Sequence, residues 1–397
     1  MILNKPILIV EISNNNCLMV AVENNNNNFK QLHEIISINN FLKENMIENF
    51  EKTCDIIRSR IYSIEQEINY TIKEVIIFID NSNCSIINLT GYKKLNGSQL
   101  SRENITYLLN SLKSQINEIE KKKTVLHIFN SKYLLDKKKT DNLPIGLFGN
   151  FYSQELSFFL ADKNYLKNLN NLFNKCNLRV KKIVSKSFIE GVNLINNDTK
   201  LENFFLIEIH KERSKVILFE NSALKFFQNF NFGSDLIIKD ISKVIGLKDD
   251  VIKKILKNLD FKSENLEKQL IEEEYFSGQN FRKVNKKLIL NIANARIQEI
   301  VEILFSKNIN FLSFFKKNIP VYLDIGDKTH LDYFKSNYHL FFSNKDNLKV
   351  IFTDNFDYRK FFEIGLNLVQ YGWKKEAIPI VQEKKSFISR FFNLIFD

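Results

Sequence analysis

The sequence predicts an α/β protein made of two similar halves, each of which opens with a β-hairpin. Short apolar runs bounded by polar residues indicate buried strands. One such pair, residues 6–11 and 17–22, flanks the turn-forming residues 13–16. The same strand–turn–strand pattern returns at residues 204–209 and 215–220. Because strands then alternate with helically spaced apolar residues in both halves, we expect two α/β lobes that face one cleft.

The first half continues with a helix and a third strand before its pattern changes. Ile56, Ile57, Ile61 and Ile64 recur at helical spacing on one side of residues 47–68, and residues 74–80 are typical of a buried strand. The next stretch predicts a small inserted α+β unit with strands at 84–89, 123–130, 132–135 and 153–161 and a helix at 98–113 that Ser98 caps. A helix at 164–176 and a strand at 180–184 complete this half.

The second half repeats the alternation over a longer stretch. A short helix at 187–195 precedes the second hairpin, and a further strand follows at 224–229. The remaining pattern predicts helices at 237–245, 249–259, 284–304, 331–337 and 361–371 and strands at 320–323 and 349–352. Residues 373–383 carry no clear periodicity and indicate a linker.

Composition excludes several classes of function. The 397 residues carry a net charge of +11 but include only 11 Gly, and neither common glycine-rich phosphate motif occurs. The His and Cys residues lack the spacing of metal or redox motifs, so no metal site is predicted. We expect a cytoplasmic chain, because signal-peptide, disulfide and membrane-spanning patterns are missing. The basic residues are interspersed, so we expect no nucleic-acid partner; steep salt-dependent DNA binding would support that alternative.

The last twelve residues, 386–397, have the pattern of an amphipathic helix. Their apolar residues cover a wide arc at 100° per residue, and basic residues precede and interrupt it. Such a helix is marginal alone in water but can bury its apolar face in the headgroup region of an anionic membrane. The predicted membrane-binding residues are Lys384, Lys385, Phe387, Ile388, Arg390, Phe391, Phe392, Leu394, Ile395 and Phe396. The alternative is a C-terminal helix that packs against the body of the protein.

Several motifs together resemble the FtsA family of actin-like bacterial cell-division proteins. The segment VLHIFNSKYLLD at residues 125–136, followed by LPIGLFG at 143–149, resembles the motif of that family's inserted 1C subdomain. Further matches are Cys176 after its helix, FGSD at 232–235, and Arg296 with Glu299. The resemblance implies an actin-like, two-lobed fold of the actin and heat-shock-chaperone ATPase type, with an inserted α+β subdomain and a C-terminal amphipathic helix.

The resemblance also implies domain limits. Residues 1–82 and 163–198 would form lobe 1, residues 83–162 the inserted subdomain, and residues 199–372 lobe 2. Residues 373–385 would be a linker, and residues 386–397 would be the membrane-targeting helix.

The departures from the family fall at the nucleotide cleft. Actin-like folds hold phosphates with glycine-containing hairpin turns, whereas the turns here read EISNNN at 11–16 and EIHKER at 208–213. The residues that the resemblance places in this cleft are Glu11, Ser13, Asn14, Asn15, Asn16, Glu208, His210, Lys211, Glu299 and Gly326. We expect a degraded cleft without hydrolysis; ATP and Mg²⁺ binding in an altered mode stays open.

The implied function is that of an adaptor rather than an enzyme. It would attach FtsZ filaments to the cytoplasmic face of the inner membrane at the division site, associate with itself, and bind other division proteins through the insert. Arg282, Lys286 and Arg296, with Lys283 and Lys287, are the predicted contacts of the FtsZ tail; a solvated helix face is the alternative. A pilus adaptor of the PilM type and an actin-like ATPase or sugar kinase are the rival functions.

Overall fold

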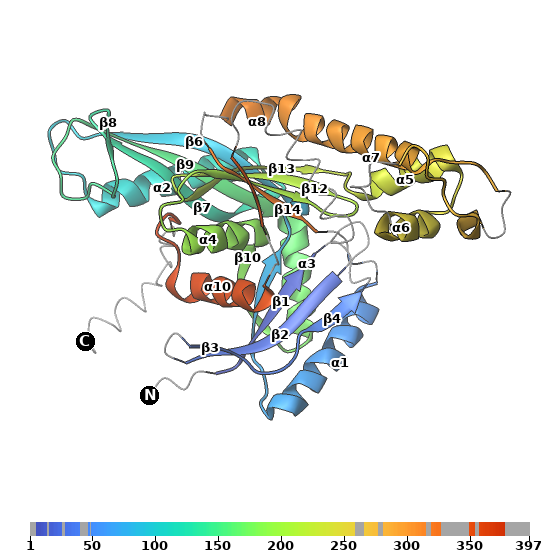
Figure 1. Cartoon of the computed structure of the whole chain (residues 1–397). Helices are drawn as coiled ribbons and strands as arrows, with labels where there is room; N and C mark the ends of the chain where they lie inside the picture. Colours follow the sequence, from blue (N-terminus) through green and yellow to red (C-terminus); the bar gives the residue numbers. More distant parts are fainter. Residues whose placement is uncertain are drawn as a thin grey trace. The chain divides into compact units, whose positions relative to one another are not determined.

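The computed structural model describes residues 5–13, 16–25, 28–39, 47, 49–258, 266–276, 281–314, 319–326, 349–353 and 357–377. These residues belong to two compact units, Met1–Val184 with Leu366–Asp397, and Ser185–Gly365 (Figure 1). The predicted helix at 331–337, residues Asn14 and Asn15, and the predicted membrane helix at 386–397 lie outside the described residues.

The first unit contains a sheet built around the predicted hairpin. Strand β1 (Ile7–Ile12) pairs antiparallel with β2 (Asn16–Asn25) and parallel with β5 (Glu74–Ile79). All six residues of β1 are buried, as the short apolar run in the sequence predicts for a central strand. The strand order is β10-β5-β1-β2-β3, and β4 also pairs with β2. The strands are β1 (Ile7–Ile12), β2 (Asn16–Asn25), β3 (Asn28–Gln31), β4 (Ile36–Asn39), β5 (Glu74–Ile79) and β10 (Arg179–Ser185).

Helices α1 (Phe50–Ile68) and α3 (Lys163–Lys175) pack on this sheet through one apolar core. The N-cap of α1 is Asn49, whose side chain accepts a hydrogen bond from the backbone N–H of Lys52 at 3.0 Å. Asn69 ends the helix in the left-handed conformation that Asn tolerates. These caps define the helix limits at Phe50 and Ile68, whereas the periodicity predicted residues 47–68.

The second unit repeats the arrangement of the first sheet. Its strand order is β13-β12-β11-β14-β15, and β11 pairs antiparallel with β12 and parallel with β14, as β1 does with β2 and β5. The strands are β11 (Phe204–Ile209), β12 (Ser214–Glu220), β13 (Ala223–Phe230), β14 (Val321–Ile325) and β15 (Val350–Phe352). Glu11 and Glu208 therefore occupy equivalent positions, each next to the end of its central strand.

Helices α5 (Asp235–Ile245), α6 (Asp249–Asn258), α7 (Lys286–Val301) and α8 (Ile309–Phe314) share an apolar core with this second sheet, together with short turns at Glu273–Phe276 and Glu302–Ser306. Helix α4 (Lys186–Asn197) also belongs to the second unit, and α10 (Tyr358–Tyr371) continues from the second unit into the first. The predicted helix at 284–304 begins later, at Lys286, because the side chain of Asn285 caps it by accepting from Leu288 N at 2.9 Å.

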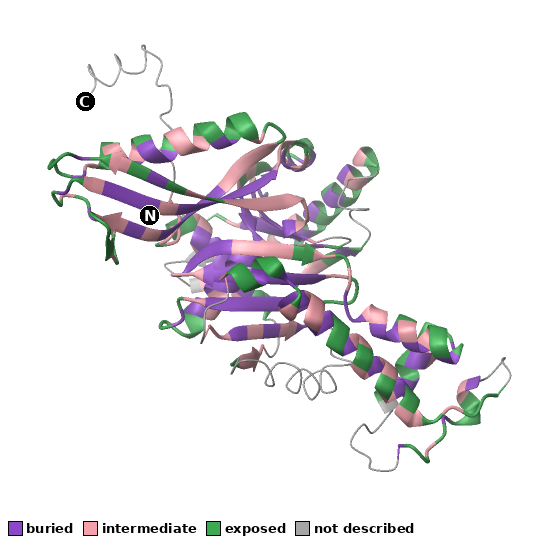
Figure 2. Cartoon of the chain, turned by 90° about the horizontal axis from the view of Figure 1, so that it is seen from above, coloured by how far each residue is buried: buried purple, intermediate pink, exposed green. Residues whose placement is uncertain are grey.

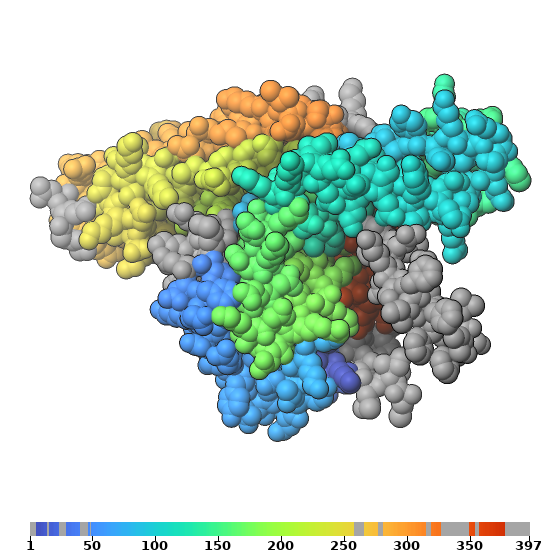
Figure 3. Space-filling view, turned by 180° about the vertical axis from the view of Figure 1, so that it is seen from behind, coloured from blue at the N-terminus to red at the C-terminus, as the bar shows by residue number. Residues whose placement is uncertain are grey.

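Residues 84–162 form a separate antiparallel sheet in the first unit. Its order is β6-β9-β7-β8, from β6 (Cys84–Lys94), β9 (Phe151–Asp162), β7 (Lys123–Leu135) and β8 (Lys138–Thr140). Helix α2 (Arg102–Ile119) covers one face and shares its own apolar core with the sheet. In Figure 3 the cyan and teal side chains of this sheet and helix form one continuous block. The two predicted strands at 123–130 and 132–135 are one strand with a bulge between them.

The predicted cap of α2 is wrong. Ser101, not Ser98, caps the helix, and it forms a reciprocal capping box with Asn104. The hydroxyl of Ser98 instead donates to the carbonyl of Leu95 at 2.5 Å, where residues 95–100 pair with residues 147–149. A pairing between segments that are distant in the sequence thus uses the hydroxyl of Ser98, which the local pattern had favoured as the N-cap.

The first residues of the predicted linker pair with a strand. The backbone N–H of Asn130 donates to Lys375 O, and that of Ala377 donates to Ile128 O, both at 2.7 Å. This bridge lies along the edge of β7 that β8 covers further on. An uncovered strand edge offers unpaired donors and acceptors, so a short extended segment binds there without any apolar periodicity of its own.

Candidate functional site

The two hairpin turns at the predicted nucleotide cleft have the same length but belong to separate units. In the first, the backbone N–H groups of Ser13 and Asn16 each donate to the other residue's carbonyl, at 3.0 and 3.2 Å. In the second, His210 N donates to Arg213 O at 2.9 Å. Each turn therefore uses backbone donors to close on itself, and these donors do not point toward a ligand.

A buried ion pair lies at the base of the second turn. Glu208 is 2% exposed, and its Oε2 atom lies 3.0 Å from Lys215 Nζ and 3.5 Å from His210 Nε2. Lys215 is the residue directly opposite Glu208 on β12. The resemblance assigns this acidic position to the nucleotide cleft, but here an internal lysine neutralises it. The carboxylate is thus poorly suited to hold Mg²⁺.

Two further carboxyl groups share this environment. Burial raises the pKa of Glu208, but Lys215 and hydrogen bonds from His210 and Glu190 outweigh it and hold the pKa well below its ordinary value. Burial and the neighbouring Glu208 raise the pKa of Glu190 well above its ordinary value. Asp324, opposite Glu208 on β14, has its pKa raised by the same two causes. These opposite shifts favour a proton on Glu190 over one on Glu208.

Two glycines fit closely against the second turn. A Cβ atom on Gly326 would lie 2.3 Å from Nδ1 of His210, so the imidazole ring covers this glycine. A Cβ atom on Gly233 would lie 2.0 Å from the carbonyl oxygen of His210. The first N–H groups at α5 donate inward as well, from Ser234 to His210 O and from Asp235 to Lys211 O, both at 2.9 Å. The space and the donors that a phosphate would need are used by the protein itself.

A pocket of about 460 Å³ adjoins this cluster within the second unit. Helix α4, strands β11, β14 and β15 and the start of α10 line it, and its charged lining is mainly acidic. The charged residues are Glu190, Asp198, Glu208, Asp324, Asp357 and Lys360. Lys360 is the one cation among the described lining residues, so the pocket offers little positive charge to a phosphate group. The hairpin register could have identified Lys215, and Asp324 lies two residues before the predicted cleft residue Gly326, whereas Glu190 comes from a distant segment and carries no sequence signal.

The remaining predicted cleft residues belong to the first unit or form pairs elsewhere in the second. Glu11 is buried in β1 of the first unit. Glu299 lies on α7, where its Oε2 atom pairs with Arg296 at 2.6 Å. Arg296 also pairs with Asp240 of α5, and the hydrogen bond to Asp240 raises the pKa of the arginine. Arg296 and Glu299 thus join two helices of the second unit.

The predicted basic face is partly neutralised. Lys286 pairs with Glu272 at 2.6 Å, and Lys287 pairs with Glu267. Arg282 and Lys283 are exposed and form no ion pair with any residue in the described part of the chain. Of the three residues predicted to bind a partner, Arg282 is therefore the one whose charge is available.

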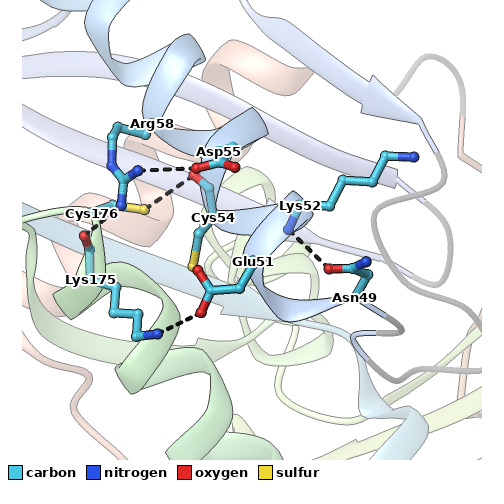
Figure 4. A network of polar contacts seen from close by, with 8 residues as sticks. All are labelled: Asn49, Glu51, Lys52, Cys54, Asp55, Arg58, Lys175 and Cys176. Atoms are coloured by element: carbon cyan, nitrogen blue, oxygen red, sulfur yellow. Dashed lines mark hydrogen bonds and ion pairs between the residues drawn. The ribbon is translucent and has the colours of Figure 1, made fainter.

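A second polar cluster, which the sequence did not suggest, joins α1 and α3 (Figure 4). Lys175 Nζ pairs with Glu51 at 2.8 Å, and Arg58 donates to the carbonyl of Lys175 at 3.3 Å. The thiol of Cys176 donates to Cys54 O at 3.6 Å, and burial raises the pKa of Cys176 to about 11. Because the thiol stays protonated at neutral pH, this cysteine packs as an apolar group and not as a nucleophile.

The described ranges contain neither a metal cluster nor a membrane-spanning helix. Across them, no three His, Cys, Asp or Glu side chains are grouped so that they could hold a metal ion. Nor does any helix within them combine the length and apolar character needed to cross a membrane.

Sequence comparison finds division proteins. The chain is 22% identical over 268 residues to "Cell division protein FtsA" of Neisseria meningitidis, covering 67% of this chain and 64% of that protein. It is 19% identical over 307 residues to FtsA of Bacillus subtilis, covering 73% and 69%. FtsA of Buchnera aphidicola is 19% identical over 202 residues, covering 51% of this chain and 48% of that protein. The chain therefore spans slightly less than two thirds of the Neisseria relative. No protein-family model matches it.

Structural comparison supports the predicted fold class. The solved PilM–PilN type IV pilus biogenesis complex aligns with a TM-score of 0.51 at 11% identity, covering 92% of this chain and 98% of that chain. With the duplicated sheet order, this similarity confirms the predicted actin-like α/β fold.

Proposed function

The chain is FtsA-like in sequence and actin-like in fold, and on that premise we propose that it is a cell-division adaptor. It would tether FtsZ filaments to the inner face of the cytoplasmic membrane at the division site and recruit other division proteins. The observation that carries the proposal is the agreement of three FtsA relatives from different bacteria.

We propose that the adaptor works without nucleotide hydrolysis. The ion pair between Glu208 and Lys215 supports this, because it occupies the acidic group on which an actin-like site would depend. The imidazole of His210 over Gly326 supports it independently. ATP and Mg²⁺ would bind weakly or not at all, and the chain would act by linking partners.

Membrane attachment is assigned to residues 386–397, whose apolar arc and lysines suit an anionic headgroup region. The bridge of residues 375–377 to β7 supports this role, since it holds residues that precede the predicted helix at 386–397 on the first unit. The sheet and helix of residues 84–162 would serve as the inserted subdomain, through which the chain contacts itself and other division proteins.

The test is co-sedimentation of the purified chain with FtsZ and with vesicles that contain phosphatidylglycerol, with and without ATP. We expect FtsZ to reach the vesicles only when the chain is present, and ATP to make no difference. A chain truncated after Lys385 should still bind FtsZ but should bring much less of it to the vesicles. Failure of the full chain to bind FtsZ would overturn the proposal.

The second candidate is a pilus-assembly adaptor, which the similarity to the PilM–PilN complex favours. That adaptor would bind a protein of the pilus machinery and would need no lipid-binding helix of its own. Loss of vesicle binding on truncation after Lys385 would argue against it, and unchanged binding would favour it.

A further inference from the structure

One end of the four-stranded sheet carries an exposed apolar loop. Ile145, Leu147 and Phe148 are 40%, 53% and 72% exposed. Their backbone is nevertheless held in place, since Leu100 N donates to Leu147 O and Gly146 N donates to Leu100 O, both at 2.9 Å. Three apolar side chains on a hydrogen-bonded loop are therefore presented outward, and Figure 2 shows exposed green loops at this end of the sheet.

Three exposed lysines lie at the same end of the sheet. The turn between β7 and β8 and the start of β8 contain the exposed residues Lys137, Lys138 and Lys139. Asp136 in the same turn is also exposed, but its carboxylate is held by backbone donors, since Oδ1 accepts from Asn150 N at 2.9 Å and from Phe151 N at 2.7 Å. Tyr92, 68% exposed, stacks on Phe151 at the same end. This end thus combines apolar side chains, an exposed aromatic ring and exposed lysines.

We propose that the tip formed by residues 137–139 and 145–148 is a second lipid contact, at which Leu147 and Phe148 enter the headgroup region of an anionic bilayer. The combination favours lipid over an acidic protein, because an exposed Phe beside lysines gains from apolar burial and from charge together. Burial of either apolar side chain should raise partitioning by roughly tenfold or more, and each lysine near the surface by severalfold.

The position of the tip on β7 allows it to act with the C-terminal helix. Residues 375–377 bridge to β7 at residues 128–130, and Leu135 ends that strand at the tip. The strand between Asn130 and Leu135 separates the two points by about 17 Å. The tip proposal deepens the proposed membrane attachment and rests on it for the choice of bilayer. The tip proposal can nevertheless be refuted without refuting membrane binding by residues 386–397, because the two contacts use different residues.

The test places a fluorescent reporter at the tip. The chain has a single Trp, Trp373, so the double variant Phe148→Trp/Trp373→Phe reports from the loop alone. A matched control is Ile119→Trp/Trp373→Phe, since Ile119 is 79% exposed at the opposite end of α2. Both variants are mixed with brominated-lipid vesicles of phosphatidylcholine, with or without phosphatidylglycerol. We expect quenching of the loop reporter only with the anionic lipid, and no quenching of the control reporter on α2.

The same measurement on chains truncated after Lys385 separates the two contacts. Quenching of the loop reporter that persists, at lower affinity, supports the tip whether or not the C-terminal helix binds lipid. An unquenched loop reporter in a full-length chain that sediments with vesicles overturns the tip and leaves the helix intact. Equal quenching of both reporters would also overturn it, as non-specific adsorption.

Substitutions give a second readout. Leu147→Ser/Phe148→Ser should lower vesicle partitioning of the truncated chain at least tenfold, and Lys137→Gln/Lys138→Gln severalfold. The matched charge control is Lys121→Gln/Lys122→Gln, an exposed pair at the opposite end of the sheet, which should change partitioning little. Loss of self-association without loss of partitioning would assign the loop to a protein contact and overturn the lipid proposal.

Discussion

At the scale of the residue, the most informative group is Lys215. It neutralises the buried Glu208, and the two side chains face each other across one hairpin. A buried ion pair contributes little net stability compared with apolar residues of similar size, but removal of one partner leaves an uncompensated charge. The pair therefore engages a carboxylate that could otherwise contact a nucleotide, and removal of either partner lowers the stability of the fold.

Lys215→Met should lower the free energy of unfolding by about 3–5 kcal/mol at neutral pH, because Glu208 then stays buried without its cation. Urea denaturation followed by circular dichroism measures this. The second change Glu208→Gln should restore a large part of the loss, since it removes the orphaned charge. Lys253→Met, which removes an exposed lysine paired with Asp250, is the control and should change little. A Lys215→Met chain as stable as the parent would contradict the buried pair.

At the scale of the element, the segment at residues 375–377 is held by more than its backbone bridge. Glu376 Oε1 lies 2.6 Å from Nδ1 of the buried His127, and Lys182 is 3.6 Å from Oε2. Burial opposes ionisation of Glu376, but the hydrogen bond from His127 and the charges of His127 and Lys182 outweigh it, so its pKa is lowered. The histidine of the motif at residues 125–136 thus binds the segment that precedes the predicted helix at 386–397.

Glu376→Gln should destabilise the first unit by about 1–3 kcal/mol at neutral pH. A lowered pKa stabilises the fold above the ordinary carboxyl pKa, and this contribution is lost as the pH falls through the folded-state value. The difference between parent and variant should therefore shrink toward acid pH. Urea denaturation at pH 7 and at pH 4 checks this. The surface variant Glu51→Gln should show little effect at either pH. A pH-independent difference would mean that the charge of Glu376 is not what matters.

These elements also show how far the sequence could be used. The hairpins, the central strands and α1 were predictable because their apolar runs are short, periodic and bounded by turn residues. The bridge of 375–377 to β7 was not, since the segment gains its structure from a strand edge about 250 residues away in the chain. Ser98 failed as a cap for the same reason. For the candidate site, Lys215 follows from the hairpin register, whereas Glu190 and Asp324 depend on packing between distant elements.

At the scale of the whole molecule, the two units would contribute different contacts to one adaptor. Lipid contacts are assigned to the first unit and its C-terminal segment, and the filament contact to the second. Each contact could be weak if the proposed self-association places many copies on one membrane, because linked contacts multiply their affinities. An adaptor of this kind would keep its function without a working nucleotide cleft, provided that its lipid and filament contacts remain.

The filament contact leads to the last prediction. Arg282→Glu should weaken binding of an FtsZ C-terminal peptide about tenfold, because Arg282 is exposed and forms no ion pair with a described residue. Lys286→Glu alone also breaks the pair with Glu272, so its effect would mix binding with folding. The charge-swapped variant Glu272→Lys/Lys286→Glu retains an opposite-charge pair and isolates the role of Lys286 in binding. Fluorescence anisotropy of the labelled peptide measures each affinity, with Lys253→Glu on α6 as the control. If Arg282→Glu binds as tightly as the parent, the filament contact lies elsewhere on the second unit or on the first.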